Sequence, residues 1–154
     1  MTSTQIAFGL GEHRDAAQTL LRSEWPLVEL PPSVKAPRFW TMTYQGLSGL
    51  VGLAIVVNEF KPSGLVGDEP RAYRPVLDYL VIDPRVRDRR LGRQLASRVL
   101  EEACEDADEV IVEVEHERPG AVRFWTKHMW CTALPDNEQT YQKVLRLRWA
   151  PAQR

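Results

Sequence analysis

The sequence has few cysteines, almost no net charge and no long hydrophobic run. Its two cysteines, Cys104 and Cys131, lie far apart without the paired spacing of a disulfide framework or a zinc site, which favours free thiols in a reducing compartment. The formal net charge of -1 argues against a general polyanion binder, because such domains are strongly basic. No apolar run approaches the ~18 residues of a membrane span, and no basic-then-apolar leader opens the chain. We therefore expect a cytoplasmic protein that has no membrane partner.

What remains is the composition of an ordinary globular chain. With 154 residues, of which 44% are hydrophobic and 27% charged, the chain can bury one core, so we expect a single domain over residues 1–154. Apolar or alternating segments predict strands at 5–10, 38–45, 50–60, 72–83, 109–115 and 140–149. Helical spacing of apolar residues predicts helices at 12–25, 91–107 and 119–130.

This order of elements predicts an α/β (α+β) fold, with a parallel pair of strands around the helix at 91–107. The final strand alternates apolar and polar residues, which is typical of a more exposed position. An exposed strand that ends in Trp149 could pair with a second copy, so a homodimer stays open.

Five arginines cluster in residues 85–95, at the turn between a strand and a helix. Three of them lie in or beside the first helical turn, namely Arg89, Arg90 and Arg93. Positive charge there opposes the helix dipole and costs roughly 0.3–1 kcal/mol for each exposed group. A bound anion reverses the argument, because guanidinium and backbone N–H groups then point at negative oxygens, and Gly92 lets backbone come close. The turn therefore predicts a phosphate site; the alternative is that Asp88 caps the helix and the arginines are solvated.

The run VIDPRVRDRRLGRQL resembles motif A of the GNAT superfamily of N-acetyltransferases. In that family a strand ends in a V-x-P turn, followed by Arg/Gln-x-x-Gly-x-Gly/Ala and a helix. Here Pro84 matches the strand exit, Arg87 the first motif position and Gly92 the last. The run VIVEVEHERPGAVRFWTKHMW resembles the next strand and helix of the family, so the likeness covers about residues 72–130. It implies a GNAT-like domain in which a mixed central sheet carries helices on both faces and its parallel pair is splayed around the cofactor.

The resemblance implies acetyl-CoA, or another acyl-CoA, as co-substrate. Pantetheine would pair with strand backbone, and the pyrophosphate would lie on the arginine turn. The positions implied to bind the donor are Leu80, Val81, Ile82, Arg87, Asp88, Arg89, Arg90, Leu91, Gly92, Arg93, Arg118 and Trp125. No spacing of His, Cys or Asp indicates a metal site.

Four positions depart from the family pattern. Arg90 stands where the first motif glycine is usual, Arg118 where an asparagine is, and Met129 where the later glycine is. Trp125 stands at the tyrosine that often protonates the departing thiolate, and an indole N–H is no practical acid. Two alternatives to an N-acetyltransferase therefore stay open. One is a CoA-binding GNAT-like module with weak or no catalysis, and the other a phosphate- or nucleic-acid-binding protein, although nucleic acid would more naturally use an extended basic stripe.

Acetyl transfer to an amine needs a group that takes a proton from the nucleophile. Asp78 lies inside an apolar strand, two residues before Leu80, where many family members carry a catalytic carboxylate. Glu113 and Glu115 share one face of the next strand, near the end where ligands gather in parallel sheets. They could relay protons or attract a cationic amine; structural or solvated roles are the alternative for all three.

Three aromatic residues complete the predicted site. Tyr141, on the final expected strand, could replace the missing general acid. Trp40 and Tyr44 fall in segments that shape the acceptor side in the family, with core packing as the alternative. The resemblance implies a small-molecule or protein amine as acceptor and does not say which.

Overall fold

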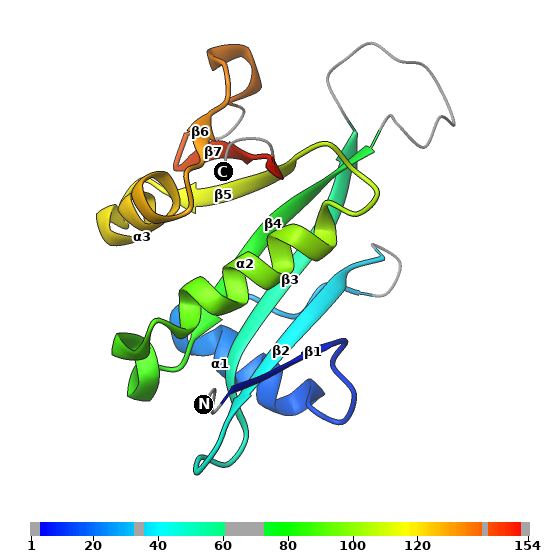
Figure 1. Cartoon of the computed structure of the whole chain (residues 1–154), viewed down its shortest axis with the longest axis vertical. Helices are drawn as coiled ribbons and strands as arrows, with labels where there is room; N and C mark the ends of the chain where they lie inside the picture. The colour runs from blue at the N-terminus through cyan, green and yellow to red at the C-terminus, as the bar shows by residue number, and fades with distance from the viewer. Residues whose placement is uncertain (1–3, 33–35, 61–72, 140–141, 152–154) are drawn as a thin grey trace. The chain divides into compact units, whose positions relative to one another are not determined.

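A computed structural model describes residues 4–32, 36–60, 73–139 and 142–151, and Figure 1 draws their helices and strands. Seven strands of these residues belong to one mixed sheet, in the order β1-β2-β3-β4-β5-β7-β6. The strands are β1 (Thr4–Phe8), β2 (Arg38–Tyr44), β3 (Leu50–Phe60), β4 (Tyr73–Ile82), β5 (Val110–Glu115), β6 (Thr132–Ala133) and β7 (Val144–Trp149). The α-helices are α1 (Arg14–Glu24), α2 (Leu91–Ala103) and α3 (Pro119–Arg123). None of the described helices is both long and apolar enough to cross a membrane.

The predicted α/β order is confirmed: β4 and β5 pair in parallel and are connected through α2. Two helices are shorter than expected. Helix α2 ends at Ala103, because the aspartate-rich segment that follows forms turns. Helix α3 ends at Arg123 and continues as a wider turn, in which the Met129 N–H donates to the Phe124 carbonyl at 3.1 Å.

The expectation of an exposed final strand is wrong. Strand β7 lies between β5 and β6, and its Leu147 and Trp149 side chains are buried. Alternating apolar and polar residues predict that one face of β7 is solvated. In the structure, the polar residues of that face instead meet charged partners within the protein, as described below. A homodimer through this strand stays an untested prediction.

The described residues group into two compact units. The first unit comprises Met1–Val57 and Tyr79–Val99, and the second comprises Asn58–Asp78 and Leu100–Arg154. Strands β3 and β4 each contribute residues to both.

The core of the first unit forms on both faces of its strands. Helix α1 presents Ala17, Leu20 and Leu21, spaced for one helical face, to Leu53 and Ile55 of β3. Figure 1 shows α1 and α2 on opposite sides of these strands.

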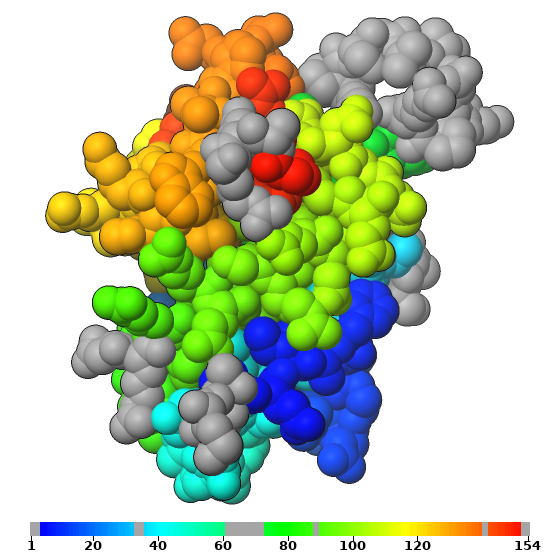
Figure 2. Space-filling model, viewed as in Figure 1, coloured from blue at the N-terminus to red at the C-terminus, as the bar shows by residue number. Residues whose placement is uncertain are grey.

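The residues of β3 that lie between those facing α1, among them Gly52, face α2 instead. A Cβ added at Gly52 would lie 3.1 Å from the Leu95 side chain of α2 and 3.0 Å from Cβ of Met42. Glycine at this position therefore favours the close approach of helix and sheet, since a larger residue would require its neighbours to shift. The edge strand β1 lies beside α2 in Figure 2, and Thr4 donates a hydrogen bond of 2.9 Å to Gln94 of that helix.

In the second unit, β5 lies between β4 and β7. Its parallel register with β4 pairs Val76 with Ile111 and Leu77 with Val112. Its antiparallel register with β7 pairs Glu113 with Arg146. Successive side chains point to opposite faces of a sheet, so one face carries buried valines of β5 and the other carries the charged residues.

Candidate active site

The arginine turn begins where β4 ends. Residues Pro84–Arg89 form a 3-10 helix that Asp83 caps, because its carboxylate accepts a hydrogen bond of 2.9 Å from the Arg85 N–H. The hydrogen bonds from the Arg85 side chain and backbone also hold the pKa of Asp83 below its usual value. The alternative that Asp88 caps the following helix α2 is a separate prediction, which this cap on the short helix does not address. The side chains of Asp88 and Arg89 lie outside the described part of the structure.

Arg87 of this turn is held by two contacts. Its Nε–H donates to the Ile82 carbonyl at 3.1 Å, and its guanidinium forms an ion pair with Glu24 at the end of α1. Even so, 47% of its side chain is exposed, so an anion can reach it from solvent. Arg90 and Arg93 are exposed as well. These guanidinium groups, with the N-terminus of α2 behind them, are donors of the kind that phosphate oxygens prefer.

Arg90 occupies a backbone conformation that favours glycine. Its φ of 60° and ψ of 21° lie in the left-handed region, which costs an L side chain roughly 1–2 kcal/mol. A glycine, which the resemblance leads us to expect at this position, would adopt the same conformation without that cost.

We expect Arg90→Gly to be at least as stable as the wild type and Arg90→Val to be less stable than both. A β-branched residue tolerates positive φ worst, so the two variants should differ by about 1–2 kcal/mol in the free energy of unfolding. Urea unfolding of the three proteins measures this order. A valine variant as stable as the glycine variant would show that the turn relaxes out of the left-handed region.

A pair of carboxyl groups lies on the charged face of the second unit. Asp78 and Glu113 each follow the paired residues Leu77 and Val112 on neighbouring parallel strands, and their side chains share a hydrogen bond. Burial raises the pKa of Glu113 to about 7, and Asp78 adds to this effect while Arg146 opposes it. The pair thus holds a proton that is exchanged near neutral pH, as a general base requires.

Two buried arginines, Arg74 and Arg146, belong to the same unit, and Arg146 contacts Glu113 of this pair. We call the eight residues of this face the charged cluster: Glu59, Arg74, Asp78, Glu109, Glu113, Glu138, Arg146 and Arg148. Glu59 bridges its two buried arginines, accepting from Arg74 at 2.8 Å and also from Arg146. Burial alone would raise the pKa of Glu59, but these two hydrogen bonds outweigh it and the pKa lies below its usual value.

Sequence reasoning brought Asp78 and Glu113 forward as candidates but missed Arg74 and Arg146. A signal was present: β5 reads VIVEVE and β7 reads VLRLRW, so acidic residues alternate in one strand and basic residues in the other. Opposite charges that alternate in the same way indicate two neighbouring strands whose charged side chains lie on the same face of the sheet.

The remaining predicted donor-binding residues fall in three environments. Leu80 is half-buried, whereas Val81, Ile82 and Leu91 are buried. Gly92 has room, since an added Cβ would meet Ile82 no closer than 3.6 Å. Trp125 is buried in the wide turn after α3, and Arg118 forms an ion pair of 3.4 Å with Glu115. Their roles in donor binding stay predictions.

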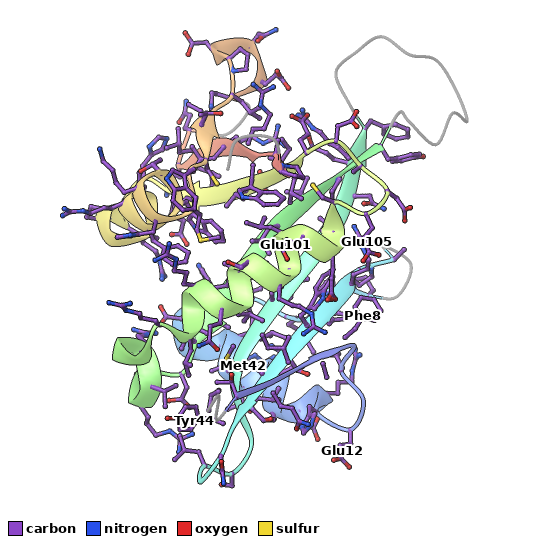
Figure 3. All side chains as sticks on the ribbon, viewed as in Figure 1. Phe8, Glu12, Met42, Tyr44, Glu101 and Glu105 are labelled. Atoms are coloured by element: carbon purple, nitrogen blue, oxygen red, sulfur yellow. The ribbon has the colours of Figure 1, made fainter. Side chains whose placement is uncertain are left out.

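The predicted acceptor side is less well supported. Trp40 is 1% exposed and packs edge to face on Phe8, with ring centroids 5.1 Å apart, which favours the core-packing alternative. Tyr44 is half-buried at the end of β2, where Figure 3 labels it. Tyr141 lies outside the described residues. Among the residues that the structure does describe, no group of three or more His, Cys, Asp or Glu side chains could hold a metal ion.

Comparison with known proteins identifies the fold. Residues 11–129 match the model of the acetyltransferase (GNAT) family. No curated protein matches the chain. Among solved structures, Arabidopsis thaliana NAA60 in complex with acetyl-CoA is 12% identical with a TM-score of 0.70, covering 96% of this chain and 99% of that one. The ribosomal-protein-S18-alanine N-acetyltransferase from Escherichia coli is 14% identical with a TM-score of 0.66, covering 96% of this chain and 93% of that one. Nourseothricin acetyltransferase is 15% identical with a TM-score of 0.68, covering 97% and 99%.

The fold is therefore that of an acetyltransferase. The chain belongs to the GNAT family, as motif A and the strand and helix after it predicted. Acetyl-CoA is the acyl donor of this family, and binding of its phosphates at the exposed guanidinium groups of the arginine turn stays a prediction.

Proposed function

We propose that this protein transfers the acetyl group of acetyl-CoA to the nitrogen of an amine and that the Asp78–Glu113 pair accepts the amine proton. The observation that carries the proposal is the half-buried Glu113 carboxyl beside Asp78, where burial and the neighbouring carboxylate raise its pKa to about 7. A base of that pKa is half ionised at neutral pH, so it can take a proton from an amine and release it to solvent afterwards.

Each proposed role belongs to a named side chain. When bound, acetyl-CoA supplies an activated thioester. Arg87, Arg90 and Arg93 hold its phosphates, and the half-buried backbone at Leu80 pairs with the pantetheine. Glu113 in its ionised form takes the proton from the attacking nitrogen, while Asp78 holds the carboxyl in place. Trp125 cannot protonate the departing thiolate, so that proton comes from Tyr141 or from water.

The acceptor amine is proposed only as a class. The similar solved structures include one enzyme named for a ribosomal protein and one named for nourseothricin, so protein and small-molecule acceptors are both represented. Glu115 is the proposed contact for a cationic acceptor, in exchange with its ion pair to Arg118. Tyr44 and Trp40 are the proposed aromatic contacts. We further propose that residues 1–154 work as one domain and that the protein, with its free cysteines, is cytoplasmic.

Acetyl-CoA should raise the melting temperature of the wild type and not that of an Arg87→Ala, Arg93→Ala double variant. A ligand at ~100 times its dissociation constant adds about 2.7 kcal/mol, or roughly 5–11 °C for a domain of this size. Thermal unfolding with and without saturating acetyl-CoA measures the shift, and an Arg14→Ala, Arg22→Ala double variant with the same charge change is the matched control. A shift that survives in the Arg87, Arg93 variant would contradict donor binding at the turn.

Release of free thiol from acetyl-CoA in the presence of amines then tests catalysis. The panel contains peptides with free N-termini, lysine peptides, polyamines and aminoglycosides. Thiol release with any one of them that depends on Glu113 supports the proposal. A protein that binds acetyl-CoA yet releases no thiol with the whole panel would favour the alternative of a binding module.

A further inference from the structure

The Glu113 carboxyl lies close to an arginine and yet keeps a high pKa. The Nε atom of Arg146 is 3.3 Å from Oε2 of Glu113, within ion-pair distance, and Arg146 stands directly opposite Glu113 in the register of β5 and β7. An adjacent guanidinium ordinarily lowers the pKa of a carboxyl well below 4.5. Burial is the largest cause of the raised pKa and Asp78 adds to it, so the charge of Arg146 offsets these effects only in part.

The hydrogen bonds of Arg146 show why its effect on the pKa of Glu113 is limited. Its Nη2 donates to Glu59, and its Nη1 donates to the Glu138 carbonyl at 3.2 Å. Its Nε, the atom nearest Glu113, is buried and has no hydrogen-bond partner among the described residues. The distance to Glu113 allows an ion pair, but the direction of the N–H does not give a hydrogen bond. Arg146 thus forms a hydrogen bond with Glu59 and interacts with Glu113 only through its positive charge.

The backbone of Arg146 is held as firmly as its side chain. The Gln139 amide oxygen accepts from the Arg146 N–H at 2.9 Å, and the Gln139 amide nitrogen donates to the Arg146 carbonyl at 2.9 Å. With only 5% of the side chain exposed, the guanidinium has little freedom to turn. The distance and direction between Arg146 and Glu113 are therefore set by the surrounding protein.

We propose that Arg146, anchored by Glu59, is a positioning residue that sets the protonation of the Asp78–Glu113 pair. This inference rests on the proposed role of Glu113 as the base. Three charged groups face Glu113, one from each strand around it: Asp78 of β4, Arg146 of β7 and Glu59 of β3. Asp78 shares the proton, Arg146 favours its loss, and Glu59 both adds a like charge and draws the guanidinium away. Burial places the pKa of Glu113 high, and the opposed effects of Arg146 and Glu59 then adjust the pH at which the pair becomes a base.

The opposite signs make the inference testable on the full chain without donor or acceptor. Titration of the Glu113 carboxyl by carbon-13 NMR, with the signal assigned through Glu113→Gln, gives its midpoint directly. Arg146→Gln should move the midpoint upward by roughly 1–2 pH units, because the cation that contacts Glu113 is lost. Glu59→Gln should move it downward by about 1 pH unit, because a like charge is lost and Arg146 becomes available to Glu113. Arg146→Lys, which keeps the charge, should lie between the wild type and Arg146→Gln.

Glu109→Gln is the matched control. It removes the same kind of charge from the same cluster, but Glu109 contacts Arg74 at 3.4 Å and Arg148 at 3.5 Å instead of Arg146. Its midpoint should equal that of the wild type. If Arg146→Gln does not fold, the comparison of Glu59→Gln with Glu109→Gln still decides, because only the first should shift the midpoint.

Midpoints that stay constant, or that move in the same direction in the Arg146 and Glu59 variants, would overturn the inference and leave Arg146 a structural residue. The acidic limb of the rate profile should move with the midpoint in each variant. If the midpoints shift in opposite directions but Glu113→Gln is fully active, Arg146 and Glu59 set the protonation of Glu113 and yet Glu113 is not the base. Failure of this inference and failure of the proposed function are therefore distinguishable.

Discussion

Glu113→Gln is expected to lower kcat/KM for acetyl transfer by roughly 10²–10⁴-fold, because a glutamine cannot accept the amine proton. The affinity for acetyl-CoA should stay unchanged, since the proposed phosphate contacts belong to the arginine turn. Initial rates of thiol release, measured from pH 5.5 to 9 with an acceptor from the panel, test this result. Glu109→Gln, with the same change of charge outside the pair, should keep the wild-type rate.

The pH profile of the wild type follows from the same group. Below a pH of about 7 Glu113 is protonated and cannot act as a base, so the rate should fall tenfold for each pH unit on the acidic side. The Glu113→Gln variant should lose this limb. If Glu113→Gln keeps both the wild-type rate and the fall in rate at acidic pH, another group is the general base.

The stability of the same variant separates loss of a base from loss of the fold. A carboxyl whose pKa is raised from 4.5 to about 7 on folding binds its proton more tightly in the native state. Ionisation therefore costs stability, and this cost grows as the pH rises from 4.5 to 7 and is complete above 7. At pH 8 Glu113→Gln should be about 1–3 kcal/mol more stable than the wild type, and at pH 4 it should not differ.

Arg74→Met should be among the most destabilising substitutions in the second unit. The Arg74 side chain is 4% exposed and contacts three carboxylates: Glu59 at 2.8 Å, Glu138 at 3.0 Å and Glu109 at 3.4 Å. Removing the arginine takes a cation from three partly buried carboxylates, of which Glu59 keeps Arg146 and Glu109 keeps Arg148. Breaking a buried ion pair costs about 3–5 kcal/mol, and we expect a loss of that order. The melting temperature should fall by roughly 6–20 °C at neutral pH. Protonation neutralises the carboxylates that lose Arg74. The difference in melting temperature between the wild type and the variant should therefore shrink as the pH is lowered.

Arg148→Ala provides the comparison. This arginine belongs to the same cluster, but 46% of its side chain is exposed and its ion pair with Glu109 is 3.5 Å long. An exposed pair of this kind contributes less than about 1 kcal/mol. Thermal unfolding of both variants at pH 7 measures the difference. Equal losses would mean that burial does not set the value of these ion pairs, and the description of Arg74 as a structural anchor would be wrong.

Local patterns were enough to find the elements of the fold and one half of the site. The apolar spacing of α1, the uninterrupted apolar run of β3 and the strand–turn–helix at residues 72–103 each depend on residues close together in the chain. The arginine turn is of the same kind, because the helix dipole and the cluster of guanidinium groups act within one turn. Family membership followed from these local signals.

Tertiary structure alone decided the other half. Asp78 and Glu113 were separate candidates until the parallel register of β4 and β5 made them neighbours. The alternation of β7 predicted a solvated face, yet its register with β5 directs Arg146 at Glu113. A strand shows which of its residues share a face, whereas its partner and its register depend on contacts between distant segments. The charges that tune the proposed base come from β3, β4, β5 and β7, so only the folded sheet brings them together.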